Sequence, residues 1–430
     1  MLRHLLGPAL ALGWVAPRPA IAQDDPVLAS RAAYQQAVKA YEAHDVPAFL
    51  AHARDAQRLR PDHGGVTYAL ASACAMSGDT AGAFAMLRRF ARLGYTADVM
   101  ADSDLAPLRS LPPFEAIRRT LARNAEPVMR SQAAFTLPER DLLTEGIAYD
   151  PGTGAFFVGS VHHRKIFRID RTGRVAEFVA SARDGLWAPL GMRADSARGV
   201  LWVATTAVRQ MAGFDTADAG RSGLFAFDLT TGALRARYLL PKDGAPHALG
   251  DVTLSRGGDV YASDSRAPVI YRVRAGADSV EQFLTSPLLL SAQGMALDRD
   301  ERAMYVADYA RGILRVDLAS REIQLLPTAD GVLALGIDGL YDVGGDLVGV
   351  QNGVTPYRVV RLHLGGDGRR IVSAEVLERA RPDYAEPTLG VVVGRTLYYV
   401  ANSQWERFRE DGTIDAPEAL RNPLVLRLPL

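Results

Sequence analysis

The sequence predicts an all-β six-bladed β-propeller preceded by an α-helical segment, and three features lead to this fold class. Over residues 131–430, a pattern of three short apolar runs recurs six times at the spacing of propeller blades. An alanine-rich stretch with apolar residues at helical spacing precedes these copies. The 430 residues are 48% hydrophobic and 23% charged, which fits folded globular domains rather than a disordered chain.

Residues 1–22 have the pattern of a cleavable secretory signal peptide. Basic Arg3 and His4 precede an apolar run over 5–15, and small residues follow at 20–22. We therefore expect a periplasmic or secreted protein, with a retained N-terminal anchor as the alternative. No later run approaches the roughly 20 apolar residues that a membrane helix needs, so no membrane span is expected.

Residues 28–125 are expected to form a helical domain. Asp45 and Asp79 stand where two corresponding helices should begin, 34 residues apart, and Leu59 and Leu93 stand where these helices should end. This period resembles the tetratricopeptide repeat, and the resemblance implies a surface for a protein partner. Two repeats are fewer than the three or so that such arrays usually need for stability, so this segment should depend on the next domain.

Charge and cysteine content exclude several classes of protein. Lys and Arg number 49, as do Asp and Glu, and no long block of one sign occurs, so a nucleic-acid partner is not expected. The single cysteine, Cys74, cannot form an internal disulfide. It falls in an apolar helical pattern and is interpreted as a buried small hydrophobe.

Residues 131–430 carry the six copies, whose starts lie 43 to 60 residues apart. Each copy supplies three strands and a fourth such as 175–179, so that one copy makes one four-stranded blade. The last copy has only three strands before the chain ends. We therefore expect the short run 133–137 to complete the sixth blade as its outer strand and close the ring. The two longest steps predict loop insertions at 209–222 and 404–422.

Polar residues recur where the first two strands of each blade should meet at one mouth of the central channel. The first strands begin at Glu145, Leu190, Gly250, Gln293, Asp338 and Leu389. The second strand runs antiparallel, so its last residue should lie beside these positions, at Ser160, Thr205, Asp264, Asp308, Asn352 and Asn402. Such hard oxygen donors suit Ca²⁺, Mg²⁺, Mn²⁺ or Zn²⁺. Asp and Asn also end strands by bonding to the following turn, which is the alternative interpretation of the second set.

Two of these phrases, Thr-Glu-Gly-Ile-Ala-Tyr-Asp over 144–150 and Gly-Ile-Asp-Gly-Leu-Tyr over 336–341, resemble the first-blade and fifth-blade metal motifs of the regucalcin and gluconolactonase family. The resemblance spans roughly residues 135–430. It implies an axial divalent metal, foremost Ca²⁺ or Zn²⁺, held by Glu145 and Asp338. Gln293 stands where the family has an Asn ligand and can offer a carbonyl oxygen through a longer side chain.

Some members of that family hydrolyse sugar lactones, so the resemblance implies an exported metal-dependent hydrolase of small lactones or esters, with Asp338 as general base. Gly250 stands where the family has a substrate-contacting Asn. Contacts to a small-molecule substrate are expected from Asp251, His247, Asp308, Asn352 and Asn402. The alternative is a non-catalytic propeller that binds a ligand or a protein and whose axial metal only stabilises the ring.

Three further residues allow two interpretations each. His162 and His163 follow a second-strand residue and are either solvated loop residues or functional groups that serve as a second base or an anion contact. Trp405, in the predicted insertion of the sixth blade, either forms a wall of the pocket or packs under its own loop. No Gly-x-Ser-x-Gly elbow, phosphate-binding loop or His-Glu-x-x-His pair occurs, so other hydrolase and nucleotide-binding classes lack support.

Overall fold

The computed structural model describes residues 25–430, so the predicted signal peptide at 1–22 lies outside the described residues. The chain divides into two compact units. The helical unit contains residues 25–128 together with 328–335 and 353–356, and the propeller unit contains the remaining described residues. Within residues 25–430, no helix is both long enough and apolar enough to cross a membrane.

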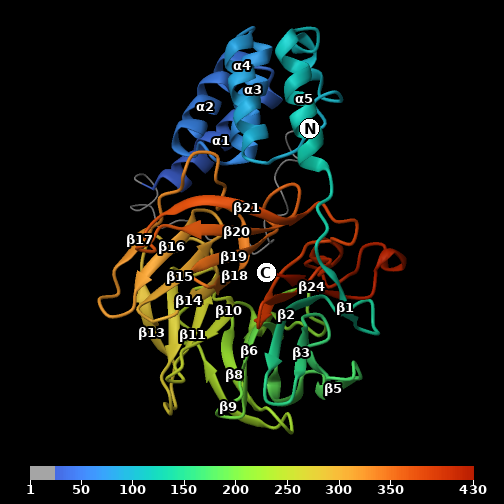
Figure 1. Ribbon diagram of the computed structural model, residues 1–430, viewed down its shortest axis with the longest axis vertical. Coiled ribbons are helices and arrows are strands. Elements are labelled where there is room, and N and C mark those ends of the chain that lie inside the picture. The colour runs from blue at the N-terminus through green and yellow to red at the C-terminus, as the bar shows by residue number, and fades with distance from the viewer. Residues whose placement is uncertain (1–24) are drawn as a thin grey trace. The chain divides into compact units, whose positions relative to one another are not determined.

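The helical unit consists of consecutive helices that pack against one another (Figure 1). Asp25, Asp45 and Asp79 each accept backbone N–H bonds at a helix start. The helices are α1 (Pro26–Glu42), α2 (Val46–Leu59), α3 (Gly64–Met76), α4 (Thr80–Arg92), the 3-10 helix η2 (Ser103–Leu108) and α5 (Pro112–Ala125). Asp45 and Asp79 therefore begin α2 and α4, as expected, whereas the 34-residue repeat itself stays a prediction.

The core of the helical unit is completed by two segments that come much later in the chain. Leu333 and Val354 are buried in the same apolar cluster as the helices, and the backbone N–H of Thr96 donates to the carbonyl of Thr355 at 3.2 Å. Cys74 is buried in this core as expected, and burial raises the pKa of its thiol to about 11. This thiol is therefore protonated at neutral pH.

The propeller unit contains six four-stranded antiparallel sheets, which confirms the predicted fold class. The first three blades are β2 (Thr144–Asp150), β3 (Ala155–Ser160), β4 (Lys165–Ile169) and β5 (Val175–Val179); β6 (Ala188–Asp195), β7 (Val200–Thr206), β8 (Ser222–Asp228) and β9 (Leu234–Leu239); and β10 (Leu249–Leu254), β11 (Val260–Asp264), β12 (Val269–Val273) and β13 (Glu281–Thr285). The last three are β14 (Ala292–Leu297), β15 (Ala303–Asp308), β16 (Gly312–Asp317) and β17 (Ile323–Leu325); β18 (Ile337–Val343), β19 (Asp346–Gln351), β20 (Arg358–Leu364) and β21 (Ile371–Arg379); and β22 (Gly390–Val393), β23 (Thr396–Val400), β24 (Leu424–Pro429) and β1 (Gln132–Thr136). Short 3-10 helices lie in the loops at η3 (Arg183–Gly185), η4 (Thr216–Asp218), η5 (Trp405–Arg407) and η6 (Pro417–Ala419).

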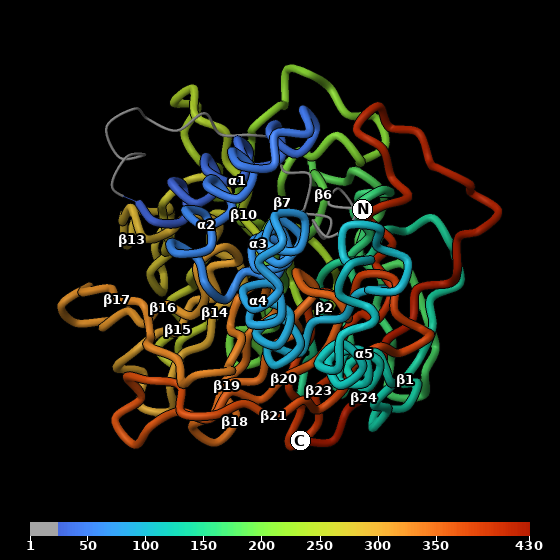
Figure 2. The backbone as a smooth tube through the Cα atoms, turned by 90° about the horizontal axis from the view of Figure 1, so that it is seen from above, coloured from blue at the N-terminus to red at the C-terminus, as the bar shows by residue number. Residues whose placement is uncertain are grey.

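The ring closes through its first and last strands. Strand β1 pairs antiparallel with β24, from Gln132 opposite Arg427 to Thr136 opposite Leu424, as the sequence predicted (Figure 1). The innermost strands contact one another in the cyclic order β2, β6, β10, β14, β18 and β22, and β22 contacts β2 again. Figure 2 shows the blades following one another around the unit in chain order. Apolar side chains between adjacent sheets form the core, for example Phe157, Met192 and Phe225 between the first two blades.

At several of the repeated glycines the innermost strands of adjacent blades approach so closely that a side chain would not fit. A Cβ on Gly146 would overlap the carbonyl oxygen of Leu190 in the next blade, and a Cβ on Gly294 would overlap that of Asp338. Because both contacts are with backbone, no side-chain rotation can relieve them.

Replacing Gly146 by Ala is therefore expected to destabilise the protein by about 2 kcal/mol or more, since two packed strands must move apart. The midpoint of denaturant unfolding measures the effect. Gly366→Ala is the matched control, because a Cβ there meets no atom of the described residues within 4 Å. Equal midpoints for the two variants would contradict the close packing of β2 against β6.

Candidate metal centre and active site

Most of the predicted first-strand site residues lie at irregularities in the innermost strands. In five of the six innermost strands the pairing with the second strand shifts register over one dipeptide. Bulges of this kind redirect side chains and often lie beside active sites. The dipeptides are Glu145-Gly146, Leu190-Gly191, Gly250-Asp251, Gln293-Gly294 and Asp338-Gly339, so each of the predicted first-strand residues except Leu389 lies in such an irregularity.

Glu145 is buried, with 5% of its surface exposed. Its Oε2 accepts a hydrogen bond from Nε1 of Trp405 at 2.6 Å, and its backbone carbonyl accepts one from Oγ1 of Thr388 at 3.0 Å. Burial raises the pKa of Glu145 well above its ordinary value, the negative charge of Asp338 raises it further, and the Trp405 bond opposes the rise. The carboxylate form of Glu145 therefore lacks a compensating positive charge.

Asp338 is also buried, with 2% of its surface exposed. Its Oδ2 accepts a hydrogen bond from Nδ2 of Asn352 at 2.9 Å. Burial raises the pKa of Asp338 to about 7, although the Asn352 bond lowers it, and the charge of Asp251 adds to the rise. Glu145 and Asp338 lie 193 residues apart in the chain. The fold nevertheless brings them close enough for the negative charge of Asp338 to raise the pKa of Glu145.

The sequence analysis missed a further buried acid, Glu386. It lies in the loop that leads to β22, with 3% of its surface exposed and with φ of 63°, a left-handed conformation that is uncommon for a residue other than glycine. Burial raises its pKa to about 8, and the charges of Asp338 and Glu406 contribute. The only sequence signal is a carboxylate three residues ahead of the repeated Leu389-Gly390 phrase. Glu145, Asp251, Asp338 and Glu386 are called the axial acids below.

Asp251 differs from the other axial acids because it has a cationic partner. Its Oδ2 lies 3.4 Å from a guanidinium nitrogen of Arg193, and its backbone N–H donates to Oγ of Ser263. Burial still raises the pKa of Asp251, whereas Arg193 lowers it. This ion pair leaves Glu145, Asp338 and Glu386 as the acids without a basic side chain bonded to them among the described residues.

The structure places other predicted site residues against loop backbone. Asp308 accepts four backbone N–H bonds, from Leu290, Ser291, Ala310 and Arg311. Asn402 bonds the backbone of Asn422 and Leu424. Backbone groups thus occupy both oxygens of Asp308 and both polar atoms of Asn402.

His247 and Gln293 are buried and have polar partners of their own. Nδ1 of His247 lies 2.7 Å from Oδ2 of Asp264, and its Nε2 lies 3.2 Å from Oδ1 of Asp243. Both ring nitrogens therefore have protein partners. Nε2 of Gln293 donates to Oγ of Ser291 at 3.1 Å.

The two predicted loop insertions meet beside Glu145. Met211 and Phe214 of the first insertion pack with Phe408 and Leu420 of the second, in one apolar cluster that also contains Trp405. Trp405 packs against its own loop, and it also bonds Glu145, whereas its role as a wall of a pocket stays a prediction. Through Trp405 this cluster adjoins the carboxylate of Glu145.

Buried acceptor atoms without partners decide whether this mouth fits a cation. Asn352 Oδ1 and Glu386 Oε2 are buried and accept no hydrogen bond from any residue of 25–430. Both are oxygens, and a buried unpaired acceptor is unfavourable unless a donor or a cation meets it. The residues present therefore fit a hard divalent cation, and Glu145 and Asp338 could hold it.

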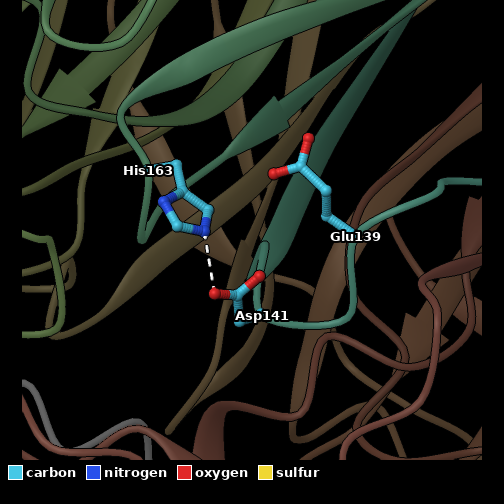
Figure 3. A group of neighbouring side chains, drawn as sticks. All are labelled: Glu139, Asp141 and His163. Atoms are coloured by element: carbon cyan, nitrogen blue, oxygen red, sulfur yellow. Dashed lines mark ion pairs between the residues drawn. The ribbon is translucent and has the colours of Figure 1, made fainter.

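Figure 3 shows a second group that could hold a metal ion, formed by Glu139, Asp141 and His163 in two loops of the first blade. Their ligand atoms lie within 4.8 Å of one another, and Nε2 of His163 is 3.0 Å from Oδ2 of Asp141. Both carboxylate oxygens of Glu139, however, accept bonds from Lys165 at 2.8 Å. A cation here must compete with that ammonium group.

Solved structures of several different proteins resemble the propeller of this chain. No protein-family model matches this sequence, and no curated protein does. A gluconolactonase from Xanthomonas campestris is 14% identical, with 69% of this chain aligned to 89% of that chain at a TM-score of 0.46. A calcium-binding regucalcin from Agrobacterium tumefaciens is 18% identical, with coverages of 67% and 90% at 0.46, and a virginiamycin B lyase from Staphylococcus aureus is 18% identical, with coverages of 68% and 83% at 0.44. At these identities the likeness extends to the fold alone, so the functional argument rests on the site.

Proposed function

We propose that this protein is an exported, divalent-metal-dependent hydrolase of small lactones or esters. The observation that carries the proposal is the cluster of axial acids, in which three carboxylates are buried with no basic side chain bonded to them among the residues that the structure describes. Several buried acids without positive partners are unfavourable for folding, so proteins keep them mainly where they bind a cation or take part in catalysis. Export rests on the signal-peptide pattern at 1–22.

In this proposal Glu145 and Asp338 hold the cation, and Gln293 is the third residue that the family resemblance implies. A bound divalent cation would polarise the carbonyl of a cyclic ester and acidify a water molecule. The Asn352 amide fixes one oxygen of Asp338, and the second oxygen is the proton acceptor that we assign to the attacking water. The apolar cluster around Trp405 limits the access of bulk water to Glu145.

A non-catalytic binding propeller is the second candidate. It is favoured by the bonds that already engage Glu145 and Asp338, because Trp405 and Asn352 each donate to an acid that the hydrolase needs. In that case the cation only neutralises the axial acids, and the helical unit supplies a surface for a protein partner.

Metal analysis joined to a substrate panel tests the proposal. The mature protein is purified, its metal content is measured, and hydrolysis of lactones and linear esters is followed before chelation, after chelation and after return of each divalent cation. We expect turnover that chelation removes and that one cation restores. Turnover unaffected by chelation would contradict metal dependence, and bound metal without turnover of any substrate would favour the binding propeller.

A further inference from the structure

Two loops of the fifth blade belong to the helical unit. One leads into β18 and the other follows β19, and most of their residues, 328–335 and 353–356, are part of the compact helical unit. Asp338 stands three residues after the first of these segments, and Asn352 stands directly before the second. The chain therefore passes from the helical unit straight to both members of the hydrogen-bonded pair Asp338 and Asn352.

Apolar side chains of both segments are buried in the helical core. Leu333 is 5% exposed and Val354 is 4% exposed, and both lie in one cluster with buried residues of α3 and α4. Leu335 is partly buried against the same cluster. Loops of folded proteins usually run over the surface, so the burial of apolar side chains from two loops is unusual. Their removal from water favours attachment of both segments to the helices.

A backbone hydrogen bond adds to this attachment. The N–H of Thr96, which follows α4, donates to the carbonyl of Thr355 at 3.2 Å. Asp330 also lies 3.8 Å from a guanidinium nitrogen of Arg89 and 4.0 Å from one of Arg92. Asp330 is mostly exposed, and exposed ion pairs contribute little. Packing and the Thr96 bond therefore hold the segments more firmly than these ion pairs do.

The third blade shows how a corresponding residue is held without the helical unit. Oδ1 of Asp264, at the end of β11, accepts backbone bonds from Ala248 and Ala267 at 3.0 Å each. Those donors lie in the two equivalent loops of the same blade. Asn352 instead bonds Asp338 through Nδ2, and its Oδ1 accepts no bond from the described residues. The position of Asn352 therefore depends strongly on the path of its own backbone into segment 353–356.

We propose that the helical unit is a positioning element for the candidate site: it buries segments 328–335 and 353–356 in its own core and thereby fixes the strands that carry Asp338 and Asn352. Leu333 and Val354 are positioning residues in this arrangement, because they act through that pair. The consequence for catalysis rests on the proposed function, whereas the structural link does not. Placement matters because a displacement of about 1 Å can lower a rate about 100-fold.

Hydrogen exchange of the full mature chain, followed by mass spectrometry, tests the link. Leu87 is fully buried in the helical core and Leu201 is fully buried between the first two blades, so Leu87→Ala and Leu201→Ala create matched cavities. We expect Leu87→Ala to accelerate exchange in β18 and β19 by at least about tenfold and to leave β14 and β15 of the fourth blade unchanged. Leu201→Ala is expected to leave β18 and β19 unchanged. Unchanged exchange of β18 and β19 in Leu87→Ala, or equal acceleration in both variants, would overturn the proposal.

Two further variants keep this test decisive. Leu87→Met roughly conserves the buried volume, so it is expected to restore the exchange of the unmodified protein. Circular dichroism verifies folding. If Leu87→Ala does not fold, Val354→Ala makes a smaller cavity in the same core and is expected to accelerate exchange in the same two strands. Unchanged exchange in Val354→Ala would then overturn the proposal.

The outcome is separable from that of the proposed function, because hydrogen exchange needs no substrate. On the best substrate of the lactone and ester panel, Leu87→Ala is expected to lower kcat by at least about tenfold and Leu201→Ala to leave it unchanged. Unchanged kcat in Leu87→Ala would overturn the positioning role and leave the hydrolase standing. Accelerated exchange of β18 and β19 in a protein that hydrolyses no lactone or ester would support the link and contradict the hydrolase.

Discussion

Asp338→Asn is expected to lower kcat/KM for the best substrate of the lactone panel by more than about 100-fold and to weaken binding of the divalent cation. The amide keeps the shape and the Asn352 contact, but it removes both the negative charge and the proton acceptor. Residues that merely orient a metal ligand already cost about 10- to 100-fold when they are replaced, so a direct ligand should cost more. Glu145→Gln is expected to act in the same direction. Steady-state kinetics and calorimetric titration of metal-free protein measure the two effects.

The same substitutions are expected to stabilise the metal-free protein. An isosteric amide removes a buried negative charge that has no positive partner, and that charge is unfavourable in a site of low dielectric. A higher melting temperature together with lost activity would therefore mark a functional acid rather than a structural one. Asp278→Asn and Glu177→Gln, both at exposed positions, serve as controls and should change neither property. Full turnover in both Asp338→Asn and Glu145→Gln would remove the mechanism.

The propeller could be predicted from the sequence because each blade is encoded by a short local pattern that repeats along the chain. Alternating apolar strands, the glycine that close packing requires and the missing fourth strand of the last copy are all visible in the chain. The pairing of β1 with β24 follows from that missing strand, and the structure confirms it. Glu145 and Asp338 could be singled out as candidates for the same reason, since both lie inside the repeated sequence pattern.

The rest of the site depends on loop conformation, which the repeat does not encode. Asp308 and Asn352 follow corresponding strands, yet backbone N–H groups of Leu290 and Ser291 bond Asp308. The equivalent segment before β18, residues 328–335, belongs to the helical unit, and Oδ1 of Asn352 accepts no bond from the described residues. The sequence did not point to Glu386, because its position depends on a left-handed backbone conformation and on bonds to Ser403. Neither feature produces a repeating pattern in the sequence.

The metal-free protein is expected to lose stability as the pH rises from about 5 to 8. Burial raises the pKa of Asp338 from 3.8 to about 7 and that of Glu386 from 4.5 to about 8, so the folded chain keeps protons that the unfolded chain releases in this range. The stabilising contribution is complete below the unfolded values near 4 and is lost as the pH passes the folded values. Each pH unit between those limits costs up to ~1.4 kcal/mol for each group. Melting curves of chelated protein should therefore shift downward by several degrees across this range.

A divalent cation is expected to reverse this trend, because it binds the deprotonated acids and its affinity rises with pH. The increase in melting temperature on adding Ca²⁺ should be small at pH 5 and largest at pH 8. His247 contributes a trend of the same sign, since its bond to Asp264 raises its pKa and that stabilisation is also lost as the pH rises. Asp338→Asn separates the two sources, because it removes one axial acid and leaves His247 untouched. If the metal-free melting temperature is flat from pH 5 to 8, or if Asp338→Asn retains the whole slope, the axial acids do not carry the uncompensated charge on which the cation site depends.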